Sequence, residues 1–194
     1  VDEFQEALAL GIKTKPVLLG PFTFLKLGKT HDKNFDRYQL LPGLVEVYVE
    51  ALRRLTSAKA EWVQFDEPAL ALDLTSAEHG LLLQAYSTLT QAVPALKVVV
   101  ATYFNELGAN LSTFAQLPVQ ALHLDMTRSG GEVGELISQM GPKKILSLGL
   151  VHGRNIWKND YQRSLETIRQ AVSLLGEERV WLAPSCSLLH VPFS

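Results

Sequence analysis

Two adjacent carboxylates, Asp66 and Glu67, have the clearest potential for chemistry, and a proline follows them at position 68. They come directly after a short apolar run, residues 61–65, that is typical of a β-strand. Carboxylates beside a strand end, with the proline fixing the turn, could bind the amine or hydroxyl group of a substrate. The structural alternative is that Asp66 accepts hydrogen bonds from backbone N–H groups of neighbouring loops.

The next apolar run, residues 97–103, ends in Thr102 and Tyr103. Both hydroxyl groups could donate hydrogen bonds to a ligand, but both residue types are also common inside strands. Tyr103 is therefore a candidate pocket residue with a structural alternative.

A further run places His123, Asp125 and Thr127 on one face of a strand, because side chains alternate between faces. A buried aspartate at a strand end needs a partner, and Arg128 is close enough in sequence to supply one. A structural ion pair between Asp125 and Arg128 is favoured over a substrate site.

Arg154 lies in a loop rich in hydrogen-bond donors, residues 151–157, which contains one flexible glycine. Its guanidinium group could clamp a carboxylate or a phosphate. The loop could equally serve only to tie neighbouring segments together, and the sequence leaves both possibilities open.

Cys186 and His190 lie four residues apart after the last apolar run. A nucleophilic cysteine would need activation of its thiolate by that histidine, and a zinc site would need two or three further ligands. Since Cys186 is the only cysteine, a thiolate-rich zinc site cannot form within the chain. A small buried cysteine is the favoured interpretation. His31 and His79 are expected at the surface.

The elements that must position these residues alternate regularly. Apolar runs typical of buried strands occur at residues 16–22, 61–65, 97–103, 119–125, 144–150 and 179–183. Segments with helical periodicity separate them, at 41–55, 77–92, 133–140 and 165–175, with a short helix expected near 111–116. Thr75 and Glu78 form a capping-box pattern, and Gly176 stands where the last helix should end. Strict alternation of strand and helix predicts an α/β fold with a parallel sheet.

An open doubly wound sheet and a (β/α)₈ barrel both fit this pattern. The sequence contains neither a dinucleotide-binding glycine fingerprint after the first strand nor a phosphate-binding P-loop. The runs recur about every 33 residues, so two more units would bring the total near the ~250 residues of a typical barrel. The prediction is a partial (β/α)₈ TIM-type barrel of about six βα units. The missing units are expected before Val1 or from another chain, and open sheet edges favour a dimer or swapped oligomer.

Composition excludes several classes of function. The net charge is −2 and no run of four Lys or Arg occurs, which argues against a nucleic-acid-binding protein. Hydrophobic residues make up 47% of the chain, too many for a disordered protein. The apolar runs are far shorter than the ~20 residues of a membrane span, so no membrane association is expected. A single cysteine suggests a reducing compartment, and a cytoplasmic location is expected.

Several strand-end segments are specific enough to resemble a known family. They are KPVLLGPFTF from Lys15, WVQFDEPAL from Trp62, TYF from Thr102, HGRNIW from His152 and SCSLLH from Ser185 to His190. In this order they resemble the N-terminal domain of cobalamin-independent methionine synthase, over nearly the whole chain.

The resemblance implies a methyltransferase that moves a methyl group from 5-methyltetrahydrofolate polyglutamate to homocysteine. It implies two face-to-face (β/α)₈ barrels, with residues 1–194 as the C-terminal part of the N-terminal barrel. Zinc would be bound by the C-terminal catalytic barrel, which becomes the expected partner of this chain.

The resemblance also implies that no zinc site is complete here. Thr102 and Phe104 stand where the catalytic barrel has its His-x-Cys pair, Asp125 stands at the glutamate position and Cys186 at the second cysteine. Thr and Phe cannot complete a closed zinc site. The segment is therefore expected to be an inactive, folate-side scaffold. Two alternatives stay open: a non-enzymatic module that pairs with a separate catalytic chain, and a stand-alone methyltransferase that uses Asp125, Cys186 and His190.

Overall fold

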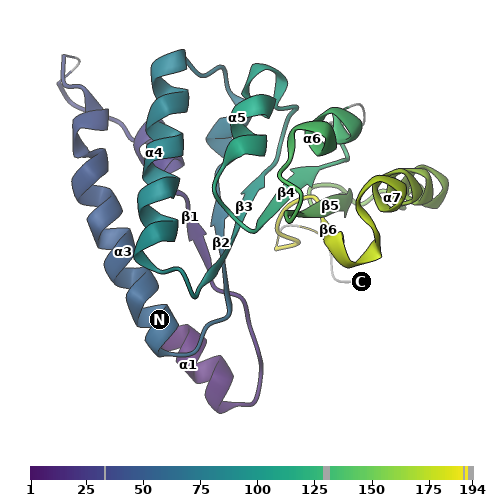
Figure 1. The fold of residues 1–194 in the computed structure, drawn as a ribbon, viewed down its shortest axis with the longest axis horizontal. Coiled ribbons are helices and arrows are strands. Elements are labelled where there is room, and N and C mark those ends of the chain that lie inside the picture. The colour runs from purple at the N-terminus through teal and green to yellow at the C-terminus, as the bar shows by residue number, and fades with distance from the viewer. Residues whose placement is uncertain (33, 129–131, 190, 192–194) are drawn as a thin grey trace.

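The computed structural model describes residues 1–32, 34–128, 132–189 and 191, in which six parallel strands form one sheet. The strands follow one another in the order of the sequence (Figure 1). They are β1 (Val17–Leu19), β2 (Trp62–Asp66), β3 (Lys97–Thr102), β4 (Ala121–Asp125), β5 (Ile145–Val151) and β6 (Val180–Pro184). A doubly wound sheet reverses its strand order at a switch point, and this sheet does not. The predicted barrel-type α/β fold with six strands is confirmed.

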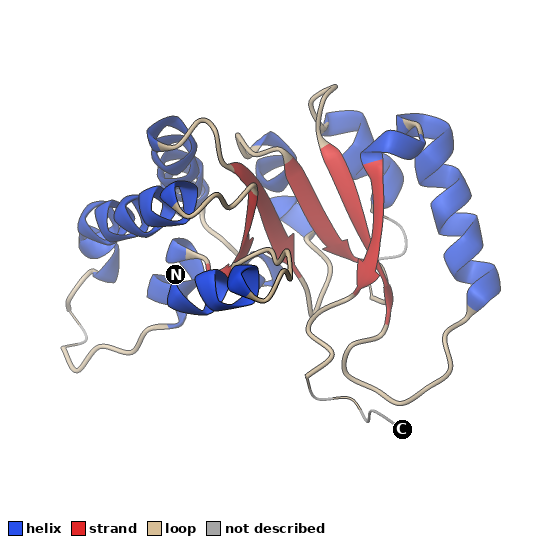
Figure 2. Ribbon diagram, turned by 90° about the horizontal axis from the view of Figure 1, so that it is seen from below, coloured by secondary structure: helices blue, strands red, loops and turns tan. Residues whose placement is uncertain are grey.

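Helices α2 to α7 pack in a row around the outside of the sheet, whereas α1 lies apart from this row, with Phe4 and Leu8 beside Trp62 and Trp181 (Figures 1 and 2). The α-helices are α1 (Asp2–Ala9), α2 (Pro21–Leu27), α3 (Leu41–Ser57), α4 (Ser76–Ala92), α5 (Leu111–Gln116), α6 (Val133–Gln139) and α7 (Tyr161–Leu175). The predicted capping box of Thr75 and Glu78 opens α4, the short helix after β3 is α5, and Gly176 ends α7. No helix in the described part is long and apolar enough to cross a membrane.

The sheet curls so strongly that side chains of non-neighbouring strands meet on its concave face. The ring centroids of Trp62 in β2 and Trp181 in β6 lie 4.8 Å apart, edge to face. Strands curl in this way in a barrel, where inward-facing side chains of several strands converge. The concave face is therefore an interior, and the helices cover the convex face.

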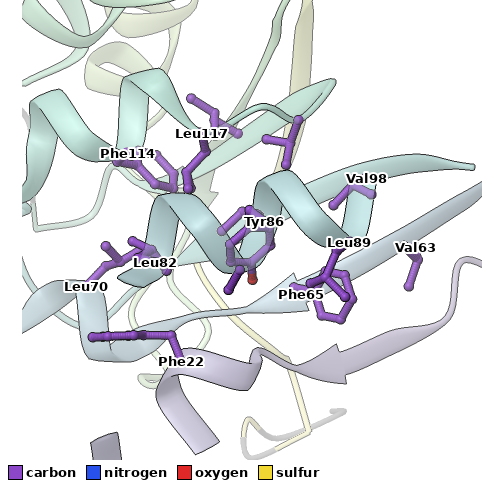
Figure 3. Close-up of a cluster of buried hydrophobic side chains, with 14 of the residues drawn as sticks. Phe22, Val63, Phe65, Leu70, Leu82, Tyr86, Leu89, Val98, Phe114 and Leu117 are labelled. Atoms are coloured by element: carbon purple, nitrogen blue, oxygen red, sulfur yellow. The ribbon is translucent and has the colours of Figure 1, made fainter. Parts of the chain in front are cut away.

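The hydrophobic core lies between β2, β3 and the helices on the convex side. Figure 3 shows Phe65 of β2, Tyr86 and Leu89 of α4 and Phe114 of α5 gathered there, all fully buried. The ring of Phe65 meets that of Tyr86 edge to face at 5.7 Å, which fixes α4 over the strand.

Two strand predictions differ from the structure. The first run does not continue as a strand to Phe22: β1 ends at Leu19 and α2 begins at Pro21. Proline fits the first turn of a helix because its fixed φ suits that position and its missing N–H is not needed there. Moreover, burial on both faces holds for only some of the runs: every residue of β4 and all of β3 after Lys97 are buried. In β2 buried and half-buried residues alternate, because its concave-side residues line an open interior.

Candidate functional site

The two adjacent carboxylates point to opposite sides of the sheet. Glu67 is fully buried on the convex side and accepts hydrogen bonds from the N–H of Phe22 (3.3 Å) and the N–H of Thr23 (2.7 Å). It also accepts from the hydroxyl groups of Thr23 and of Tyr86, the latter at 2.9 Å. Burial raises the pKa of Glu67 to about 7, although these donors act to lower it. Glu67 therefore anchors the start of α2 to α4 and does not face the interior.

Asp66 faces the concave side at the carboxyl end of β2. Its carboxylate accepts hydrogen bonds from the Gln64 side-chain amide (2.7 Å) and from the Tyr103 hydroxyl (3.0 Å). Burial, together with the negative charge of Asp66, raises the pKa of Tyr103, so the phenol stays protonated and donates. The structure thus brings Asp66 and Tyr103 into direct contact.

His123 lies beside this pair but is committed to structural hydrogen bonds. Its Nε2 meets the backbone carbonyl oxygen of Ser185 (3.2 Å), and its Nδ1 meets the Ser147 hydroxyl (2.9 Å). A carbonyl oxygen only accepts, so Nε2 carries the proton and Nδ1 accepts from Ser147. Burial lowers the pKa of His123, which favours this neutral form. Neither ring nitrogen is available as a base or a metal ligand.

Asp125 holds two segments at the mouth of the curled sheet. Its carboxylate accepts hydrogen bonds from the N–H of Phe104 (3.2 Å) and the N–H of Thr127 (2.9 Å). Arg128, the expected ionic partner, is exposed. Phe104 has φ 88°, a left-handed conformation that a non-glycine residue rarely adopts, so the contact to Asp125 helps to hold strained backbone.

Arg154 joins the site through aromatic contacts. Its Cζ lies 4.6 Å from the ring centroid of Phe104, and that ring meets Tyr103 edge to face at 4.5 Å. The cation–π contact restrains an otherwise exposed guanidinium group. Arg154 is thus linked to Tyr103 through Phe104, and it does not line the cavity described below.

Cys186 packs closely against Gly153. A Cβ at Gly153 would lie 2.7 Å from the Cys186 Sγ, so only glycine fits there. Burial raises the pKa of the Cys186 thiol, which is the opposite of what an activated nucleophile requires. Cys186 is half-buried, not buried as expected, and its environment is that of a packing residue at the cavity wall. His190 lies outside the described residues.

The Cys186 environment predicts slow alkylation and disulfide exchange. In the folded chain, Cys186 should react with a thiol reagent about tenfold or more slowly than in the urea-unfolded chain at the same pH, because less thiolate is present. Arg154→Gln should slow the reaction further, since the nearby Arg154 charge lowers the pKa of the thiol. Colorimetric thiol titration reports on this residue alone, because the sequence has no other cysteine. Equal rates in the folded and unfolded chains would contradict the assignment.

These side chains border one cavity of about 550 Å³ at the carboxyl ends of the strands. Asp66, Tyr103 and Cys186, from the sequence-based candidates, line it together with His123, Ser147 and Lys15. Glu67 and Asp125 do not line this cavity. Lys15, Gln64 and Ser147 were not predicted from the sequence as site residues, because the search was limited to the strand ends. The alternation of side chains along a strand could have identified Gln64, which lies two residues before Asp66 and therefore on the same face.

The positions aligned with zinc ligands do not fit a metal. Thr102 shares the convex side with Val98 and Val100, and within the described part its buried hydroxyl has no hydrogen-bond partner. Phe104 offers only an aromatic ring. Across the described ranges, no three His, Cys, Asp or Glu side chains are grouped so that they could hold a metal ion.

Solved structures share this fold. A B12-independent methionine synthase from Shewanella sp. W3-18-1, in complex with selenomethionine, matches 98% of this chain and 60% of its own, with a TM-score of 0.77 and 16% identity. A putative vitamin-B12-independent methionine synthase from Listeria monocytogenes matches 90% of this chain and 57% of its own, with a TM-score of 0.70 and 16% identity. At this identity the likeness concerns the fold alone.

Curated sequences give a closer match. The 5-methyltetrahydropteroyltriglutamate–homocysteine methyltransferase of Nitrobacter winogradskyi is 49% identical over 99% of this chain, and that of Caulobacter vibrioides 48% identical over 99%. The chain spans about a quarter of the length of these relatives. The family model for the N-terminal domain of cobalamin-independent synthases matches residues 1–176. The chain therefore belongs to the cobalamin-independent synthase family and corresponds to its N-terminal domain.

Proposed function

We propose that this chain is the C-terminal part of the N-terminal barrel of a two-barrel methyltransferase that makes methionine from homocysteine and 5-methyltetrahydrofolate polyglutamate. The observation that carries the proposal is the 49% identity, over 99% of the chain, to a relative named for that reaction. The segment acts as a non-catalytic scaffold on the folate side, and the catalytic barrel of the same protein is its partner.

The state of the interior side chains supports a scaffold role. His123 is neutral and bonded at both nitrogens, and the Cys186 thiol is protonated. Methyl transfer to a thiol needs a thiolate, which a metal or a base must generate. Because the residues here do not fit zinc, we assign zinc and thiolate formation to the catalytic barrel, and we place the reaction in the cytoplasm.

The exposed apolar side chains at both sheet edges support a larger barrel. Val17 of β1 is 53% exposed and Leu182 of β6 is 61% exposed. Parallel strands with such residues are normally covered on both faces. We propose that further βα units of the same protein pair with these edges, and that two copies of this chain would pair there when those units are missing.

A chimera tests the proposal. The matching quarter of the Caulobacter vibrioides relative is replaced by this chain and expressed in a bacterium that requires methionine. We expect growth without methionine, zinc bound to the chimera, and homocysteine-dependent methyl transfer in the purified protein. The isolated chain should show no methyl transfer and no stoichiometric zinc.

Two results would contradict the proposal. A chimera that is folded and binds zinc but is inactive would show that this segment serves another function. Methyl transfer or stoichiometric zinc in the isolated chain, lost on Cys186→Ser, would show that the segment is itself catalytic. The unmodified relative and the relative lacking the matching quarter are the positive and negative controls.

A further inference from the structure

The interior face of the curled sheet is divided by side-chain size. Towards the amino ends of the strands it carries Trp62, Val99, Ile145 and Trp181. Towards the carboxyl ends it carries smaller or polar groups, which leave the cavity of about 550 Å³. Barrel interiors are normally filled by layers of bulky branched side chains. We call this space the polar cup; it is lined by Lys15, Asp66, Tyr103, His123, Ser147 and Cys186.

The wall of the polar cup is rigid on one side. The His123 ring bonds to the Ser147 hydroxyl with one nitrogen and to the Ser185 carbonyl oxygen with the other, so neither ring nitrogen needs a ligand. Gly149 is in contact with the same wall, since a Cβ there would lie 3.0 Å from the His123 ring and 2.8 Å from the Ser185 Cα. These groups therefore shape the cavity without using their hydrogen-bonding capacity on a ligand.

Unlike the His123 ring, the Asp66 carboxylate can still accept hydrogen bonds from a ligand. The two groups that donate to it are neutral, so its negative charge is not balanced by them. Gln64 bonds one carboxylate oxygen and Tyr103 bonds the other, which fixes the orientation of the group and leaves lone pairs free on both oxygens. A carboxylate accepts more than two hydrogen bonds, and a positive partner is favourable where solvent is partly excluded. Asp66 is thus arranged to receive a cationic donor from the cavity.

Lys15 supplies the opposite charge on the same cavity. Lys15 is an exposed residue on the open side of the cavity. Partial desolvation lowers the pKa of its ammonium group, and the attraction of Asp66 opposes this by raising it. Lys15 and Asp66 do not form an ion pair with each other. The ion pairs among the described residues are Lys26–Glu78 and Arg54–Glu50. The polar cup therefore presents one negative and one positive group with a gap between them.

We propose that the polar cup binds a small zwitterionic amino acid, with its ammonium group on Asp66 and its carboxylate on Lys15. A simple cation would gain nothing from Lys15 and a simple anion would be repelled by Asp66, whereas a zwitterion is attracted by both charges. The cavity volume lies in the ~300–1,000 Å³ range of small-molecule pockets. This site is separate from the methyl-transfer chemistry that we assign to the catalytic barrel.

Calorimetric titration of the 194-residue chain tests the site. The probes are glycine and L-alanine, with methylamine and acetate as ligands that carry one of the two charges. We expect binding in the millimolar range for the amino acids, and at least about tenfold weaker binding for either single-charge ligand. Asp66→Asn should weaken glycine binding at least about tenfold, whereas the exposed matched control Asp73→Asn should not change it.

Two conservative variants keep the test valid if Asp66→Asn fails to fold. Tyr103→Phe removes one hydroxyl and should weaken glycine binding a few-fold, about one neutral hydrogen bond. Lys15→Gln should abolish the preference for glycine over methylamine, and the exposed matched control Lys29→Gln should retain it. Circular dichroism melting establishes that each variant is folded.

The inference is overturned if no amino acid binds up to on the order of 50 mM, far above the millimolar dissociation constants expected here. It is also overturned if glycine and methylamine bind equally to the unmodified chain, or if Asp66→Asn and Lys15→Gln leave binding unchanged. These outcomes are independent of the chimera experiment. If the chimera is active and the chain binds no amino acid, only the polar-cup proposal is rejected. If the chain binds amino acids and the chimera is inactive, only the methyltransferase role is rejected.

Discussion

Replacing Glu67 with alanine is expected to lower the free energy of unfolding by about 3–5 kcal/mol. The substitution removes the shared acceptor of the Phe22 and Thr23 N–H groups and of the Thr23 and Tyr86 hydroxyls, and leaves all four donors buried. Glu67→Gln should cost less, about 1–3 kcal/mol, because one amide oxygen can still accept. Urea unfolding followed by circular dichroism measures both changes.

Glu46→Ala is the matched control for Glu67. Glu46 is exposed on α3, so its removal should change the unfolding free energy by no more than about 0.5 kcal/mol. A cost below about 1 kcal/mol for Glu67→Ala would show that the buried hydrogen bonds do not secure α2.

The raised pKa of Glu67 also predicts how the stability of the chain depends on pH. The pKa of Glu67 is about 7 in the folded chain, above its ordinary value of 4.5, so the folded state holds the proton more tightly. Stability from this group is therefore present below about pH 4.5 and is lost as the pH rises through about 7. Glu67→Gln should flatten this decline between about pH 5 and 8, and an unchanged slope would reject the assignment.

Gly149→Ala is expected to destabilise the chain by about 2–3 kcal/mol. The new Cβ would lie 2.8 Å from the Ser185 Cα, a backbone atom that can move only if β6 shifts away from β5. Because the His123 ring lies 3.0 Å from the same point, the variant should also weaken amino-acid binding in the polar cup. Thermal and urea unfolding measure the first effect, and calorimetry measures the second.

Gly80→Ala is the control for Gly149. Its Cβ would meet nothing within 4 Å, and Gly80 lies inside α4. Alanine is the better helix former, so this variant should stabilise the chain by up to about 1 kcal/mol. Equal effects of the two substitutions would show that contact with β6 is not what requires glycine at position 149.

Local patterns in the sequence predict most of the elements. The capping box at Thr75, the stop at Gly176 and the short helix at 111–116 depend on neighbouring residues, and the structure confirms them. The boundary between β1 and α2 was harder to predict, because Val17 to Phe22 contains no charged or hydrogen-bonding side chain and only the Gly20–Pro21 pair indicates the change. An apolar run is compatible with a strand or a buried helix, so hydrophobicity alone cannot divide it.

The sequence by itself determined the α/β class, the barrel-type winding and the family, since these depend on spacing along the chain and on motifs. Only the tertiary structure decided which side chains meet. Asp66 and Glu67 are adjacent and chemically alike, yet one enters the interior with Tyr103 and the other is buried under α2 and α4. The reason is that neighbouring residues point to opposite faces, and whether a face carries helices or a cavity depends on segments distant in sequence.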